Sequence, residues 1–134
     1  MENMYLGLGH IAINTRDMAE SIAFYEKIGG RLLSVSSLEK PEGTLKLALV
    51  SLGSVTLELL QYPTEQALVK GSIPHFALLV EDVDKAAAAI RAAGVDSFKT
   101  EEKAVCPGLF GGLENRFFTG PSGEEIELLH MYRS

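Results

Sequence analysis

The chain has 134 residues, 46% of them hydrophobic, which is enough for one domain with a hydrophobic core and excludes wholesale disorder. A formal net charge of −6 without a basic run disfavours binding to nucleic acid or to anionic membrane surfaces. We find no apolar run of membrane-spanning length and no signal-peptide pattern. The single cysteine, Cys106, excludes an internal disulfide, so we expect a cytoplasmic protein.

A duplicated pattern organises the chain. The matching segments are 9–17 (GHIAINTRD) with 74–82 (PHFALLVED), and 57–60 (LELL) with 126–129 (IELL). Matches that recur in the same order indicate a repeated structural unit. We therefore predict two copies of one module, residues 5–62 and 73–132, within a single domain that spans residues 1–134.

The first module begins with a predicted strand that carries His10. A helix follows, because Asp17 has the character of an N-cap, with Glu20 at capping-box spacing, and Gly29 marks the end of the helix. Three further strands are predicted, at 31–37, 44–52 and 54–61.

The second module repeats this order. A strand carries His75, Asp82 caps a helix rich in alanine, Gly94 ends that helix, and strands are predicted at 96–100, 115–119 and 124–131. The sequence thus predicts an α+β fold of tandem βαβββ modules that form a curled mixed sheet. The glycine-rich loop 101–114 is open to two interpretations, a lid over a ligand or an ordinary hairpin connection.

Strand alternation places four polar side chains on the sheet faces that are opposite to the bulky apolar residues. In each module the bulky apolar residues of the first and last strands share one face, which should pack on the helix. The opposite faces carry His10, Glu58, His75 and Glu127. Carboxylates flanked by leucines are costly to bury unless they are paired or bind a cation, and two imidazoles with two carboxylates suit a divalent transition metal. We predict that these four residues form one metal site.

Other polar residues are not assigned to this site. His130 lies three residues from Glu127 and should therefore point to the opposite face of a regular strand. Glu125 shares the face of Glu127 but lies nearer the turn, where solvent can reach it. Cys106 has no obvious activating base and receives no role.

The sequence motifs of this chain resemble those of the vicinal oxygen chelate superfamily, which includes glyoxalase I. The similar parts are residues 9–13, Asp17 and residues 21–25, then 57–59, 74–77 and 120–128, so the resemblance covers nearly the whole chain. Gly120 and Ser122 depart from the family's usual aspartates at turn positions. Within the family, glyoxalase I-like enzymes share the order His, Glu, His, Glu, whereas epimerases usually have Gln at the position of Glu58. Fosfomycin-resistance enzymes and ring-cleaving dioxygenases use two His and one Glu.

The resemblance implies a metal-dependent lyase or isomerase that converts a hemithioacetal to a thioester through an enediolate. It also implies Glu127 as the base, with Glu58 as its counterpart, and a homodimer whose site takes one pair of ligands from each subunit. Glyoxalase I often has an Arg four residues after its first His, where this chain has Asn14. The thiol of the substrate is therefore either glutathione or another thiol.

Redox chemistry is not required, so nickel, cobalt, zinc and manganese all suit such a site. Two alternatives to the glyoxalase I reading remain. One is another enzyme on this scaffold, namely an acyl-CoA epimerase, a ring-cleaving dioxygenase or an antibiotic thiol transferase. The other is a metal-free module that binds a small molecule.

Overall fold

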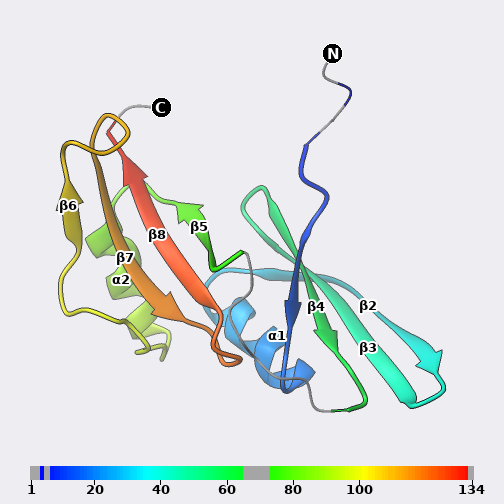
Figure 1. Cartoon of the computed structure of the whole chain (residues 1–134). Coiled ribbons are helices and arrows are strands. Elements are labelled where there is room, and N and C mark those ends of the chain that lie inside the picture. Colours follow the sequence, from blue (N-terminus) through cyan, green and yellow to red (C-terminus); the bar gives the residue numbers. More distant parts are fainter. Residues whose placement is uncertain (1–3, 5–6, 65–72, 133–134) are drawn as a thin grey trace. The chain divides into compact units, whose positions relative to one another are not determined.

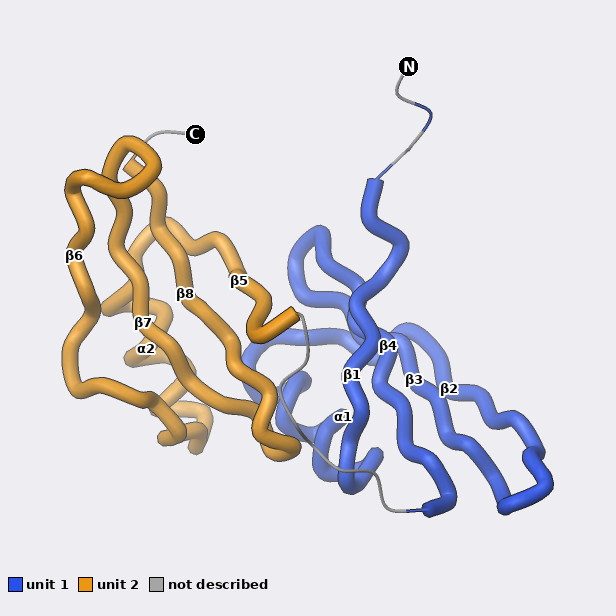
Figure 2. Tube along the Cα trace, viewed as in Figure 1, with its two compact units in different colours: residues 1–66 blue, residues 67–134 orange. Residues whose placement is uncertain are grey.

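In a computed structural model the chain divides into two compact units, residues 1–66 and 67–134 (Figure 2). The structure describes residue 4 and residues 7–64 and 73–132. Much of the segment between the two predicted modules, residues 65–72, therefore lies outside the described residues. No helix in the described part of the chain has the length and apolar character needed to cross a membrane.

Unit 1 is a four-stranded mixed sheet with one helix on it (Figure 1). Its elements are β1 (Ile11–Asn14), α1 (Met18–Lys27), β2 (Arg31–Lys40), β3 (Gly43–Leu52) and β4 (Val55–Gln61). The strand order is β1-β4-β3-β2, and β1 runs parallel to β4 while the other neighbours are antiparallel. The predicted order βαβββ is confirmed for this module.

Unit 2 repeats the same topology. Its elements are β5 (His75–Leu79), α2 (Val83–Ala92), β6 (Ala104–Cys106), β7 (Leu113–Thr119) and β8 (Glu125–Met131). The strand order β5-β8-β7-β6, with β5 parallel to β8, matches that of unit 1 strand for strand. The two mixed sheets with their two helices confirm the α+β fold class.

The two helices begin in the same way, as the duplicated sequence predicts. A carboxylate oxygen of Asp17 accepts a hydrogen bond from the Glu20 amide at 3.0 Å, and Asp82 accepts one from the Lys85 amide at 3.0 Å. Both caps have extended backbone angles, near φ −147° and ψ 113° at Asp17. Each bond satisfies an amide that has no partner within its own helix, which fixes where the helix begins.

Each helix buries its apolar stripe against the bulky face of its own sheet. Helix α1 buries Met18, Ser21 and Tyr25, which follow a helical spacing, against β3 and β4. Within the sheets, the fully buried strand residues include Val50, Leu57, Leu59, Phe118, Ile126 and Leu128. The predicted apolar faces are therefore confirmed, and the opposite face of each sheet is left for the polar residues.

The predicted strand at 96–100 is confirmed only as a short pairing around Phe98, with backbone hydrogen bonds from Lys99 to Phe117 and from Thr119 to Ser97. Only Phe98 forms a bridge there, with Phe118, and the chain joins the sheet again as the short strand β6. The cause is Arg116, whose buried guanidinium donates two hydrogen bonds to the Thr100 carbonyl, at 3.1 and 2.6 Å, and lies over the Phe98 ring. Because the Thr100 carbonyl bonds to this side chain, the edge strand is divided into two short pieces, one at Phe98 and the other at β6.

The junction between α1 and β2 leaves no space for a side chain at Gly30. A Cβ at this position would lie 2.6 Å from the Tyr25 carbonyl oxygen and 3.1 Å from Val50 Cγ1. We predict that Gly30→Ala lowers the free energy of unfolding by about 1–3 kcal/mol, as overpacking does in a tight site. Urea denaturation should detect this loss, and Gly108→Ala, where a Cβ meets nothing within 4 Å, should not show it.

Candidate metal and catalytic site

In unit 1 the first predicted pair is formed. Glu58 lies in β4 with its neighbours Leu57 and Leu59 buried against α1, so its side chain points to the other face of the sheet. His10 immediately precedes β1, which pairs with β4 so that Ala12 lies beside Glu58. His10 Nε2 lies 3.4 Å from Glu58 Oε1. The parallel pairing of β1 and β4 thus brings together residues that are 48 positions apart in the sequence.

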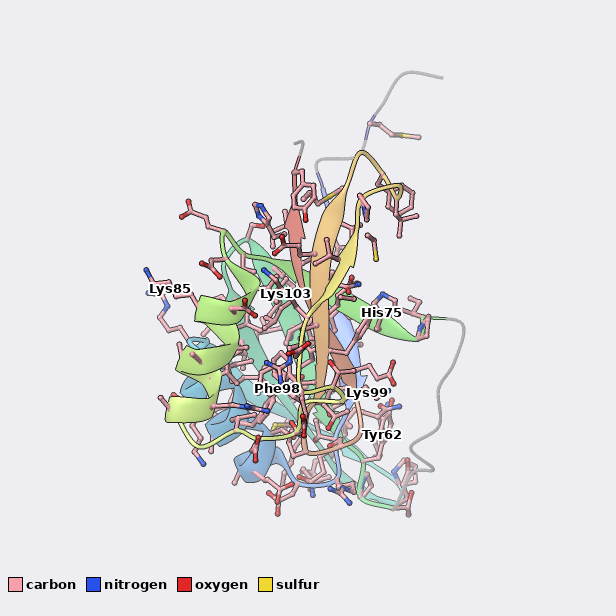
Figure 3. The ribbon with its side chains drawn as sticks, turned by 90° about the vertical axis from the view of Figure 1, so that its left-hand side faces the viewer. Tyr62, His75, Lys85, Phe98, Lys99 and Lys103 are labelled. Carbon is pink, nitrogen blue, oxygen red and sulfur yellow. The ribbon has the colours of Figure 1, made fainter. Side chains whose placement is uncertain are left out.

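In unit 2 the second predicted pair has the same form. His75 begins β5, Glu127 lies in β8, and their Nε2 and Oε1 atoms are 3.2 Å apart. Figure 3 shows His75 on the side of the sheet opposite to helix α2, which carries Lys85. The Glu127 side chain is only 11% exposed, against 24% for Glu58. The carboxylate of unit 2 is therefore the more enclosed of the two.

Strand β7 adds two contacts that the sequence reasoning missed. Asn115 Nδ2 donates a hydrogen bond of 2.8 Å to Glu127 Oε2. The Phe117 ring meets the His75 ring edge to face, with 5.3 Å between the centroids. Asparagine is disfavoured in strands, so Asn115 between charged neighbours was a signal, but only the pairing of β7 with β8 shows what it contacts.

The residues set aside in the sequence reasoning are not members of the two pairs, although Glu125 is the register partner of His75 in the pairing of β5 with β8. The Nδ1 atom of His130 lies 3.2 Å from the Val80 carbonyl oxygen, so this ring bonds to the backbone. Glu125 forms an ion pair with Lys99. Cys106 is a free thiol at the end of β6. Neither the His130 contact nor the Glu125 ion pair involves a member of the two His–Glu pairs.

Glu114 belongs to a separate cluster on the other face of β7. Lys103 donates to it at 2.6 Å and the Tyr132 hydroxyl at 2.8 Å. The hydrogen bond from Lys103, helped by that from Tyr132, lowers the pKa of Glu114, while the same bonds to Glu114 raise the pKa values of Lys103 and Tyr132. The ionised Glu114 carboxylate links β7 to the residue before β6 and to the residue after β8. A carboxylate held ionised in this way is poorly suited to accept a proton.

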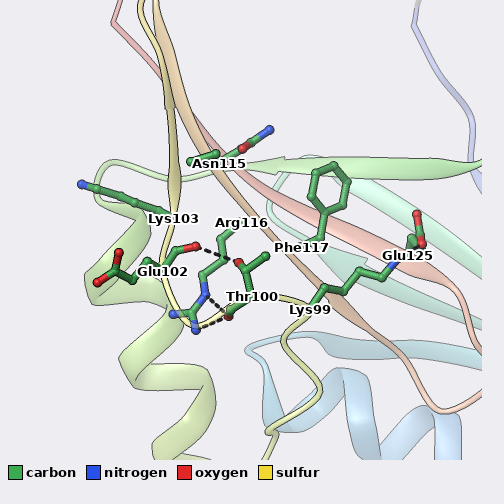
Figure 4. A pocket seen from close by; sticks show the side chains of 9 residues that line it. Lys99, Thr100, Glu102, Lys103, Asn115, Arg116, Phe117 and Glu125 are labelled. Atoms are coloured by element: carbon green, nitrogen blue, oxygen red, sulfur yellow. Dashed lines mark hydrogen bonds and ion pairs between the residues drawn. The ribbon is translucent and has the colours of Figure 1, made fainter.

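A cavity of about 430 Å³ has two residues in its wall that contact the His75–Glu127 pair, Asn115 and Phe117 (Figure 4). It is lined by residues 99–100, 102–104 and 115–117 and by Glu125. A small molecule bound in this cavity would therefore lie next to the pair.

The loop before β7 carries exposed apolar side chains. Leu109 is 46% exposed and Phe110 is 75% exposed. Phe110 also has a φ of +49°, which is unusual for a residue with a side chain. The interpretation of loop 101–114 as a lid stays a prediction.

The spacing within each pair suits a metal ion. Ligand atoms about 2.0–2.2 Å from a zinc-like ion lie roughly 3.0–3.4 Å from each other at square or tetrahedral angles. The nitrogen–oxygen distances of 3.4 and 3.2 Å agree with this separation. Among the described residues no cluster of three or more potential ligands occurs. Each pair thus offers two donors of suitable chemistry, and a complete coordination sphere needs more.

The sequence is similar to a known protein family and to a bacterial protein over nearly its whole length. The family described as Glyoxalase/Bleomycin resistance protein/Dioxygenase superfamily matches residues 7–128. The uncharacterized protein YwbC of Bacillus subtilis (strain 168) is 32% identical over 124 residues, which cover 90% of this chain and 94% of that protein.

Solved structures of similar fold cover nearly the whole chain. A glyoxalase family protein from Enterococcus faecalis is 28% identical, with a TM-score of 0.72, and the match covers 95% of this chain and 99% of that one. The fosfomycin resistance protein FosX from Listeria monocytogenes is 22% identical, with a TM-score of 0.70 and 93% of each chain covered. The likeness to FosX is one of fold.

Proposed function

Since the chain belongs to the Glyoxalase/Bleomycin resistance protein/Dioxygenase superfamily, we propose that it is a metal-dependent lyase or isomerase of glyoxalase I type. Its substrate would be the hemithioacetal of a thiol and an aldehyde, and its product the isomeric thioester. The observation that carries this proposal is the repeated His–Glu pair, with nitrogen and oxygen spaced as ligands of one ion in both units.

The proposed site joins the two pairs on one divalent ion, so that His10, Glu58, His75 and Glu127 are its protein ligands. Two neutral imidazoles and two carboxylates balance the charge of the ion, and they suit nickel, cobalt, zinc or manganese. We further propose a homodimer in which His10 and Glu58 of one subunit meet His75 and Glu127 of the other.

The carboxylates perform the proton transfer in this proposal. One of them, Glu127 by analogy with the family, takes the proton from the carbon that bears sulfur and returns it to the neighbouring carbon, with Glu58 as its counterpart. No atom is gained or lost, because the hemithioacetal and the thioester are isomers. A bound ion would act as a Lewis acid on the two neighbouring substrate oxygens. The cavity beside Glu127 would hold the rest of the substrate.

We predict that the purified protein contains a divalent transition metal and converts methylglyoxal to a thioester in the presence of a thiol. Elemental analysis measures the metal, and thioester formation is followed with glutathione, bacillithiol and other thiols in parallel. Chelator-treated protein is the control and should lose turnover until metal is returned. A metal-loaded protein that turns over no hemithioacetal would contradict the proposal. A protein that takes up no metal would favour a metal-free binding module instead.

A further inference from the structure

We propose that Asn115 is a positioning residue that holds Glu127 so that one carboxylate oxygen, Oε1, is presented to a metal ion. This inference deepens the proposed function and rests on the metal-binding role of Glu127. It adds a residue to the site that is neither a ligand nor a base, and it predicts how the ion is bound in unit 2.

The hydrogen bonds around Glu127 divide its two oxygens between two partners. Oε2 accepts the 2.8 Å hydrogen bond from Asn115, and Oε1 lies 3.2 Å from His75 Nε2. An ionised carboxylate can only accept, so it is the amide nitrogen of Asn115, and not its oxygen, that must face Oε2. With Oε2 engaged, Oε1 is the oxygen beside the imidazole, which favours binding of an ion through a single oxygen.

The sheet register explains why Asn115 reaches this carboxylate. In the antiparallel pairing of β7 and β8, Phe117 lies directly opposite Glu127, and Asn115 lies opposite Leu129, which is the diagonal position. Phe117 meets the His75 ring, so two residues on one face of β7 contact both members of the pair. Because the carboxylate is 11% exposed, water competes little with the hydrogen bond from Asn115.

The duplicated unit provides an internal comparison. In unit 1 the residue directly opposite Glu58 is Leu49, and the diagonal position, opposite Leu60, is Leu47. Leu47 therefore occupies the place that Asn115 has in unit 2, and a leucine cannot donate a hydrogen bond. Within the part of the chain that the structure describes, the Glu58 carboxylate is paired with His10. The two halves of the proposed site therefore differ at both positions of the neighbouring strand, and of these four residues only Asn115 has a side chain that can donate a hydrogen bond.

The test replaces Asn115 with the residue that the other unit uses. We expect Asn115→Leu to weaken Co²⁺ binding by about 10–100-fold, the usual loss when a residue that orients a ligand is removed. Affinity is measured by competition with a chelator, and the visible absorption spectrum of the Co²⁺ protein should change because Glu127 can then bind through both oxygens. Asn115→Ala tests the same loss with less added bulk.

Thr119→Val is the matched control, because Thr119 lies on the same face of β7, at its end, opposite Glu125. It should keep the affinity and the spectrum of the wild-type protein. The metal-free melting temperature of all three variants should stay close to that of the wild type. Unchanged Co²⁺ affinity in both Asn115 variants would overturn the inference, as would an equal loss in Thr119→Val or failure of both Asn115 variants to fold. Absence of Co²⁺ binding by the wild-type protein would overturn the proposed function itself.

Discussion

Glu127→Gln should lower thioester formation by about 10²–10⁴-fold, the usual contribution of a positioned general base, and should leave the fold intact. Glutamine has the same shape but neither the charge nor the basic oxygen. Its amide oxygen would accept the hydrogen bond from Asn115 Nδ2, which turns its NH₂ group toward His75 Nε2 in place of Oε1. The proposed ion would lose one ligand, and the reaction would lose its base.

The stability of this variant separates a catalytic from a structural role. Glu127 is buried, and its carboxylate lies beside the His75 and Asn115 side chains, so removal of its charge does not create a new unpaired ion. We expect the free energy of unfolding of the metal-free protein to change by less than about 1 kcal/mol. Chemical denaturation and elemental analysis of the same sample measure both effects.

Glu39→Gln is the control for the replacement of a glutamate by a glutamine. Glu39 is an exposed strand residue whose carboxylate accepts a hydrogen bond from Thr44 at 2.9 Å, and its replacement should leave metal content and turnover unchanged. If Glu127→Gln kept full turnover, the carboxylate would have no catalytic role. If it unfolded under mild conditions, the role would be structural.

Local patterns were sufficient to predict most elements of both modules. Capping by Asp17 and Asp82 depends on residues only three positions away, so the sequence contains the whole signal. The alternation of Leu57, Glu58 and Leu59 likewise assigns each side chain to a face without knowledge of any neighbouring strand. These two features account for where the helices begin and for the sheet face on which Glu58 lies, whereas the His–Glu contacts themselves also need the pairing of β1 with β4 and of β5 with β8.

The features that sequence reasoning missed depend on contacts between distant segments. The strand predicted at 96–100 is interrupted because the guanidinium of Arg116, which lies 16 residues beyond Thr100, donates hydrogen bonds to the Thr100 carbonyl group. The contact between Asn115 and Glu127 depends on how β7 and β8 align, and alternation alone does not determine the register of two strands. Alternation predicts the face on which Asn115 lies, but not its partner.

Co-expression of His10→Ala and His75→Ala chains should restore activity that neither variant has alone. Each substitution removes one imidazole from a pair and leaves a carboxylate without its nitrogen partner, so each homodimer should fail to hold the ion. In the proposed homodimer, half of the randomly mixed dimers contain both variants, and each of these has one site with all four ligands. Recovery should therefore reach about a quarter of wild-type turnover, as the symmetry of a two-fold dimer requires.

The arrangement of the two pairs decides this result. If both pairs of one chain met on one ion, no mixture of the two variants would contain a complete site, and no turnover would return. Co-expression of His10→Ala with the double variant His10→Ala/His75→Ala is the control, because every site then lacks the first imidazole whatever the arrangement. Sedimentation of the wild-type protein as a monomer, together with no recovery, would contradict the shared site but would leave the four ligands in place. Full metal content and turnover in either single variant would contradict the four-ligand site itself, because an ion that loses one of its two imidazoles should bind far more weakly.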